Sequence, residues 1–171
     1  MLEKSQIIDL AWLELGEQNQ LYNINISDRL AIAGTLFDQV VRELAVDSNF
    51  MFNAKTVKLN LNLNSTNDEG EFRYNRPVDY KNRIWFSDRL ARMEGEFIYS
   101  TAKDLRLCYC YDMQFADYPD SIQNLLVLKL AQRLAKAYDV HYDKLGRIEG
   151  AIKDETNRIL ISEGLPFPIP R

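Results

Sequence analysis

The chain has 171 residues, of which 46% are hydrophobic and 27% are charged, so a buried core is available to one domain or to two small ones. Its formal net charge is −4, from 25 acidic and 21 basic residues. A surface that clamps many phosphates needs clustered lysine and arginine, so this charge argues against broad nucleic-acid binding. The same net charge is compatible with a mildly acidic wall along which DNA slides.

The two cysteines, Cys108 and Cys110, lie two residues apart in a strand pattern. At that spacing they share a face with Cα atoms about 6.5–7 Å apart, which is at or beyond the reach of an unstrained disulfide. We expect reduced, buried or half-buried thiols in a reducing compartment. Because His141 is the only histidine, no cysteine–histidine metal site is expected.

The first residues lack the basic start and apolar run of a signal peptide. No stretch of the sequence approaches the about 20 apolar residues that a membrane span requires. We therefore expect a soluble protein that is synthesised in the cytoplasm and makes no contact with a membrane.

Two helices are predicted near the start of the sequence. In residues 5–15 the apolar residues recur at helical spacing, and Gly16 is a typical C-terminal stop. Residues 27–46 follow a polar connector, with Ser27 as the predicted N-cap. The second helix carries one apolar stripe, formed by Leu30, Ala33, Phe37, Val40, Val41 and Leu44.

A β region is predicted over residues 53–115. Residues 57–64 alternate between aliphatic and polar side chains without interruption, which is the clearest strand signal in the sequence. Residues 105–111 form a second alternating strand, and we expect the two strands to share a sheet with one buried face. The buried residues are expected to include Leu59, Leu61, Leu107 and Tyr109.

Two further helices are predicted at residues 120–138 and 143–162. Pro119 marks the start of the first, whose residues are apolar on most sides, as is typical of a helix packed between neighbours. Asp117 and Asp120 flank Pro119, and helix capping explains these carboxylates more simply than acid–base chemistry does.

The sequence nominates no catalytic, cofactor-binding or metal-binding residues. His141 lies between two predicted helices with no evident nucleophile or orienting carboxylate, so a surface or capping role is expected. Gly-rich phosphate loops, zinc-protease patterns and nucleophile elbows are absent from the sequence. A small enzyme, or a nucleic-acid-processing or regulatory binding protein, with a dispersed site stays open as an alternative function.

Residues 163–171 form a predicted extended tail in which prolines alternate with apolar residues. Proline at alternate positions excludes a helix and stiffens the segment, so docking it loses less conformational entropy than docking a flexible peptide. Packing on its own domain or fraying is the alternative. The predicted docking residues are Leu165, Pro166, Phe167, Pro168, Ile169 and Pro170.

The order of these parts resembles the head-to-tail adaptor proteins of tailed bacteriophages, a group that includes the tail tubular protein A type. A first helix ends in the Leu15-Gly16 step, and a long charged helix follows at residues 27–46. A proline–x–aspartate step in the β region is matched by residues 77–80. An alternating strand with tyrosines and a Tyr118-Pro119 pair then precede a helix rich in Leu and Ala.

The resemblance implies a single adaptor domain over residues 1–171. The expected fold is α+β, a helical bundle from the N- and C-terminal helices with an inserted antiparallel β-sheet and an extended C-terminal tail. The resemblance further implies a structural virion protein, not an enzyme, that forms a dodecameric ring at the neck between head and tail. Its expected partners are the portal protein, which receives the tail, a downstream tail or nozzle protein, and further copies of itself. DNA would pass through the ring during ejection without sequence-specific contacts.

Overall fold

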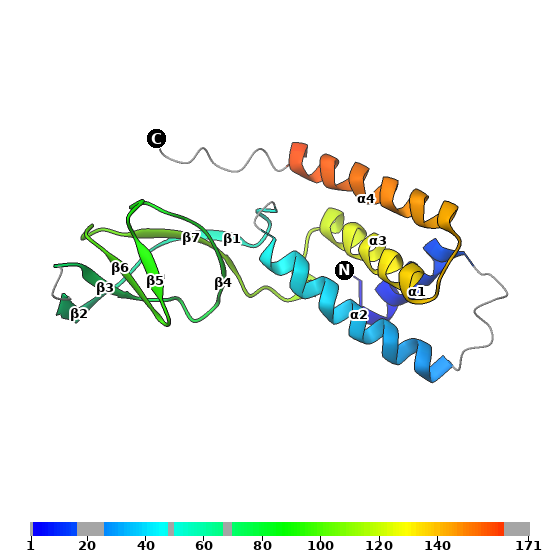
Figure 1. Ribbon diagram of the computed structural model, residues 1–171, viewed down its shortest axis with the longest axis horizontal. Coiled ribbons are helices and arrows are strands. Elements are labelled where there is room, and N and C mark those ends of the chain that lie inside the picture. The colour runs from blue at the N-terminus through cyan, green and yellow to red at the C-terminus, as the bar shows by residue number, and fades with distance from the viewer. Residues whose placement is uncertain (1, 17–25, 48–49, 67–69, 163–171) are drawn as a thin grey trace. The chain divides into compact units, whose positions relative to one another are not determined.

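The computed structural model describes residues 2–16, 26–47, 50–66 and 70–162 (Figure 1). Within these residues the chain is a mixture of helices and antiparallel sheets, which confirms the α+β class. It divides into two compact units. Of the described residues, those up to 44 and from 113 to 162 form a helical unit, and those from 45 to 112 form a β unit.

The helical unit is organised around α3 (Asp120–Ala137), which packs against both α1 (Lys4–Leu15) and α4 (Tyr142–Ser162) (Figure 1). Because α3 has neighbours on several sides, its apolar residues are buried around most of its circumference. α1 has a single buried stripe, as its spacing predicted, and α4 buries only Ile148 and Ile159 fully. The buried residues of α1 are Ile7, Ile8, Ala11 and Leu15.

The long helix α2 (Ile26–Val46) is fixed by one aromatic contact and two ion pairs. The ring of Phe37 meets Phe115, in the 3-10 turn η2 (Phe115–Asp117), edge-on at 5.1 Å. Lys4 binds Asp38 at 2.7 Å, and Arg133 binds Glu43 at 2.6 Å. Four residues of the predicted stripe are buried, whereas the Leu30 side chain is 53% exposed. No helix in the described part of the chain is long and apolar enough to cross a membrane.

The β unit contains a three-stranded and a four-stranded antiparallel sheet. The first sheet has the order β1-β7-β4, and the second has the order β2-β3-β6-β5. The strands are β1 (Ala54–Lys58), β2 (Leu61–Thr66), β3 (Phe72–Asn75), β4 (Tyr80–Phe86), β5 (Arg92–Glu94), β6 (Phe97–Ser100) and β7 (Arg106–Tyr111).

The prediction of one uninterrupted strand over residues 57–64 is wrong. Val57 pairs with Leu107 in the first sheet, and the Leu59 N–H still donates to the Leu105 carbonyl at 2.9 Å. After Asn60 the chain crosses to the second sheet, where Leu61 pairs with Tyr74. The alternation of side chains persists through the crossing because both sheets face the same core, so the pattern carries no sign of the break.

That shared core contains residues of both sheets. Leu59, Leu107 and Tyr109 are buried in it, as predicted, and Leu61 is partly buried against it. The pairing of β1 with β7 is confirmed, although the β2 part of the predicted strand belongs to the other sheet. The remaining buried members of the cluster are Tyr74, Phe86, Ala91, Ile98 and Leu105.

β7 is the central strand of its sheet and is buried on both faces. Its second face carries Cys108 and Cys110, both free thiols and both buried. Burial, together with the neighbouring thiol, raises the pKa of Cys110 to about 11, so the thiol stays protonated and unreactive. These cysteines are therefore packing residues of the β unit, in agreement with the expectation of reduced thiols.

Two asparagine side-chain amides donate hydrogen bonds to the last carbonyls of α2, which the sequence pattern did not predict. The fully buried Asn53 donates from Nδ2 to the Ala45 carbonyl at 2.8 Å and to the Tyr111 carbonyl at 3.2 Å. Asn82 donates to the Val46 carbonyl at 2.8 Å. A helix leaves its last carbonyls without partners inside the helix, so these amides satisfy groups that would otherwise lose hydrogen bonds.

Replacing Asn53 by Ala should lower the free energy of unfolding by about 1–3 kcal/mol, because one buried and one partly buried carbonyl lose a donor. Urea unfolding followed by circular dichroism measures the change. The matched control is Asn60→Ala, at an exposed position, with an expected change of at most about 0.5 kcal/mol. Equal stability of the two variants would contradict the role of Asn53.

Candidate functional site

The predicted docking residues of the tail, Leu165 to Pro170, lie outside the described residues. The candidate site among the described residues is the turn at residues 77–80, which connects β3 to β4 and carries the proline–x–aspartate step. The Tyr80 N–H donates to the Pro77 carbonyl at 3.2 Å, which closes the turn. Val78 is fully exposed at its tip, although it is an apolar residue.

Asp79 fixes this turn to the sheet through its carboxylate and its carbonyl. Lys55 on β1 donates to Oδ2 at 2.5 Å, and the Tyr109 hydroxyl on β7 donates to Oδ1 at 2.8 Å. The Asp112 N–H donates to the Asp79 carbonyl at 3.0 Å. Three hydrogen bonds, from β1 and from β7 with the residue that follows it, therefore hold one residue of the turn, so Val78 is presented on a rigid support.

The electrostatics of Asp79 suit a structural anchor. The hydrogen bond from Lys55 is the main reason why the pKa of Asp79 is lowered, and the same bond raises the pKa of Lys55. The pKa of Tyr109 is raised chiefly by burial and also by its bond to Asp79. All three groups keep their ordinary charge at neutral pH, and none has a pKa near 7, where a general acid or base works best.

Aromatic rings surround the lysine of this cluster. The Lys55 ammonium lies 4.7 Å from the ring centre of Tyr111 and 5.5 Å from that of Tyr109. The Tyr80 and Tyr109 rings lie 5.8 Å apart, and the Arg76 guanidinium covers the Tyr80 ring at 5.6 Å. Cation–π contacts and ring contacts of this kind add rigidity to a partly exposed surface.

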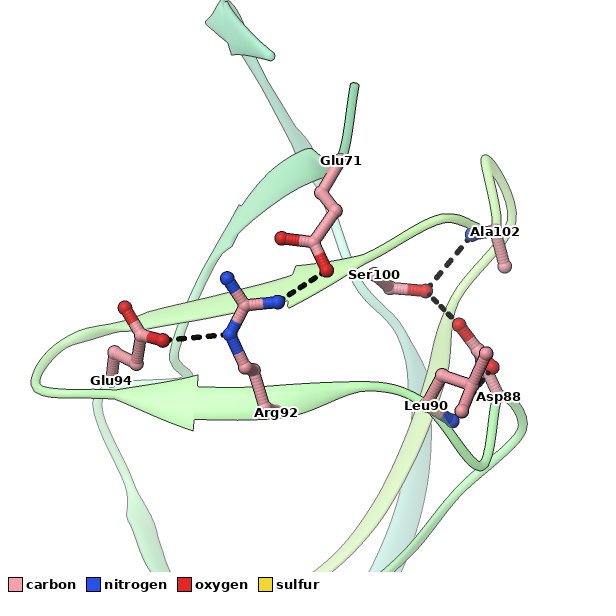
Figure 2. Close-up of polar contacts among 7 residues, drawn as sticks. All are labelled: Glu71, Asp88, Leu90, Arg92, Glu94, Ser100 and Ala102. Carbon is pink, nitrogen blue, oxygen red and sulfur yellow. Dashed lines mark hydrogen bonds and ion pairs between the residues drawn. The ribbon is translucent and has the colours of Figure 1, made fainter. Parts of the chain in front are cut away.

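A second polar cluster lies in the four-stranded sheet, where Arg92 binds two glutamates (Figure 2). Its Nε donates to Glu94 at 2.7 Å, and its Nη1 donates to the nearly buried Glu71. Glu71 is the main cause that raises the pKa of Arg92 above its already high value. The arginine thus compensates a buried carboxylate and ties β5 to the segment before β3.

The third cluster joins the loops after β4 and β6 (Figure 2). The buried Ser100 hydroxyl donates to Asp88 Oδ2 at 2.5 Å and accepts the Ala102 N–H at 3.0 Å. The Leu90 N–H donates to Asp88 Oδ1 at 2.9 Å, and Ser100 is the main cause that lowers the pKa of Asp88. A carboxylate of lowered pKa is a poor base, so this pair does not activate the serine as a nucleophile.

In the described part of the helical unit, a hollow of about 340 Å³ lies between α1 and α4. Lys144 lies in it and donates to the Leu15 carbonyl at 2.5 Å, at the C-terminal end of α1. Its lining mixes apolar residues with charges of both signs, so it favours no class of ligand. The lining residues are Leu13, Glu14, Gly16, Lys144, Arg147, Ile148 and Ala151.

The structure also places the other residues singled out in the sequence. His141 is exposed in the turn before α4, where the Asp143 N–H lies 3.5 Å from its Nδ1. The expected capping of α3 by Asp117 or Asp120 is wrong, because Pro119 occupies the N-cap position and no side chain caps the helix. Gln123 instead donates to the Tyr118 carbonyl at 2.8 Å. Among the described residues no three His, Cys, Asp or Glu side chains form a group that could hold a metal ion.

Comparison of the sequence with protein-family models and with curated proteins finds no match.

Replacing Asp79 by Asn should lower the free energy of unfolding at pH 7 by about 1 kcal/mol, a value reduced for the partial exposure of the Lys55–Asp79 pair. Because the pKa of Asp79 is lower in the folded chain, the unfolded chain binds more protons in acid. The stabilisation is present above the unfolded pKa of about 3.9 and is lost as the pH falls through the lower folded value.

Urea unfolding at pH 7 and at a series of acidic pH values measures this prediction. The difference between wild type and Asp79→Asn should shrink in acid. Asp104→Asn is the matched control, because Asp104 forms a much more exposed pair with Lys58 and should contribute less at pH 7. A difference for Asp79→Asn that stays constant down to strong acid would contradict the anchor role of the ionised carboxylate.

Proposed function

We propose that the chain is a head-to-tail adaptor of a tailed bacteriophage, a structural virion protein that joins the portal to the tail. The observation that carries the proposal is the order of its parts. Two helices precede the β region and two follow it, with the Leu15-Gly16, Pro77–Tyr80 and Tyr118-Pro119 steps in the order of the adaptor family.

The arrangement proposed for the intact adaptor is a helical bundle from both ends of the chain with the antiparallel β region inserted into it. An inserted unit leaves and re-enters its host at two chain crossings, here near residues 44–45 and 112–113. One unit can then bind the portal while the other receives the next tail component. An adaptor needs two such surfaces, because it has a different neighbour on each side.

The polar clusters of the β unit support a binding role. Asp79, Arg92 and Asp88 are each engaged by partners within the unit, and their contacts hold turns and loops in place. Val78 at the tip of the rigid turn gives an apolar contact point that needs little ordering on binding. A ring assembles from contacts between different faces of neighbouring copies and closes when the rotation fits, which suits a channel for DNA.

The test is to mix the purified protein with the portal ring of the same phage and to measure native mass and negative-stain images. The adaptor function predicts a ring that gains about one copy for each portal subunit. Removal of residues 164–171, the predicted portal-docking tail, should abolish this gain and leave the helix content measured by circular dichroism unchanged.

A monomer in solution is compatible with the proposal, because assembly can depend on the portal template. An intact portal ring that gains no mass over a wide range of protein concentrations would contradict it. Turnover of a substrate by the protein alone would favour the alternative of an enzyme.

A further inference from the structure

The tail has a chemical asymmetry that follows from its prolines. In an extended chain the backbone N–H and C=O of successive residues point to opposite edges. Pro166, Pro168 and Pro170 all fall on one edge, which therefore has no N–H donor. The other edge keeps the complete N–H and C=O groups of Leu165, Phe167 and Ile169. An extended tail can thus pair as a β-strand along one edge only.

β1 has an unpaired edge whose outward backbone groups recur at every second residue, as do those of the tail. It is the outer strand of the sheet β1-β7-β4, and no described strand pairs with its other side (Figure 1). The Tyr111 N–H donates to the Asn53 carbonyl, and the Leu59 N–H donates to the Leu105 carbonyl, both at 2.9 Å. By alternation Lys55 and Val57 also turn their backbone groups toward β7, so those of Ala54, Thr56 and Lys58 point outward.

The other edges of the β unit are less suitable. β5 has three residues, β4 has two register shifts against β7, and β2 has one against β3. Short length and irregular pairing both protect an edge from an added strand. β1 pairs with β7 over five residues without a shift, the Thr56 side chain is exposed, and no strand in the described part of the unit pairs with its outer edge.

We propose that residues 165–169 of one copy add as an antiparallel strand to the free edge of β1 in a second copy. The pairs would be Leu165 with Lys58, Phe167 with Thr56, and Ile169 with the Ala54 carbonyl. Ala54 contributes only its carbonyl because its N–H donates to the Met51 carbonyl at 3.0 Å. The proline edge of the tail then faces outward and accepts no further strand, so the contact ends after one addition.

This inference rests on the proposed ring and assigns the tail to a neighbouring copy in place of the portal, which was the partner expected from the sequence. The donor segment and the acceptor edge are different parts of the chain, so the contact between two copies is head-to-tail, which is the kind that closes into a ring. Strand addition obtains its affinity from main-chain hydrogen bonds and its specificity from alternate side chains. Pairing with a second copy, unlike pairing with the copy's own β1, would also build the proposed ring.

The experiment adds a synthetic peptide of residues 163–171 to the protein that lacks residues 164–171 and records backbone amide shifts by NMR. The expected shifts are at Thr56 and Lys58. A peptide with N-methylated Phe167, which keeps the side chain but loses the N–H, should bind about ten-fold more weakly or worse. A peptide with Pro168→Ala restores an N–H on the opposite edge and should bind like the original. These three results together support the proposal.

Shifts confined to other residues would overturn the proposal, as would equal binding of the N-methylated peptide or binding of the peptide to the portal alone. Thr56→Pro in the protein removes an outward N–H and should also abolish binding, and the N-methylated peptide keeps the test valid if that variant does not fold. In the full chain, hydrogen-exchange protection of Thr56 and Lys58 should rise with protein concentration. Protection that is independent of concentration would overturn the assignment to a second copy.

These measurements use no portal unless the peptide fails to bind the protein. The peptide can therefore fail to bind β1 while the portal ring still gains copies of the protein. Conversely, the peptide can bind β1 while the portal ring gains no mass. The two failures are distinguishable.

Discussion

The β unit depends on one constraint, which is that two small sheets must bury a single apolar core between them. Sheets of three or four short strands are marginal on their own. Tyr74 from one sheet and Leu107 and Tyr109 from the other are almost completely buried, and burying each large apolar side chain contributes about 1.5–3 kcal/mol. The crossing at Asn60 joins the sheets covalently, so neither can separate without exposing this core.

The surface features of the unit follow from the same arrangement. Lys55 lies opposite Tyr109 in the pairing of β1 with β7, which brings both side chains to the carboxylate of Asp79. The turn at residues 77–80 is therefore held by residues 24 and 30 positions away in the sequence. Those contacts exist only while the register of β1 and β7 is kept, so the rigid turn depends on the core below it.

Periodicity in the sequence was sufficient to place the four helices and the strand at residues 105–111 to within a few residues. It failed at residues 57–64, because alternation reports which side chains are buried and not which strand lies beside them. The register of β1 against β7 was also beyond the sequence, so neither the Lys55–Asp79–Tyr109 cluster nor the bonds of Asn53 to Ala45 and Tyr111 could be predicted. The aspartate of the turn was visible as a motif, but its partners required the fold.

The four sheet edges of the β unit differ in how readily they could accept an added strand. Exposed strand edges can pair with other chains. Three of the four edges in this unit are protected, because β5 is short and because β4 and β2 pair irregularly with their neighbours. The ammonium groups of Lys55 and Lys58 on the fourth edge are engaged by Asp79 and Asp104, so their charges are partly neutralised where they would otherwise repel an added strand. An edge strand whose pairing stays regular, beside three that are short or irregularly paired, carries a risk of aggregation. A tail that can pair along one side only would cover such an edge and end the growth of the sheet, which removes that risk.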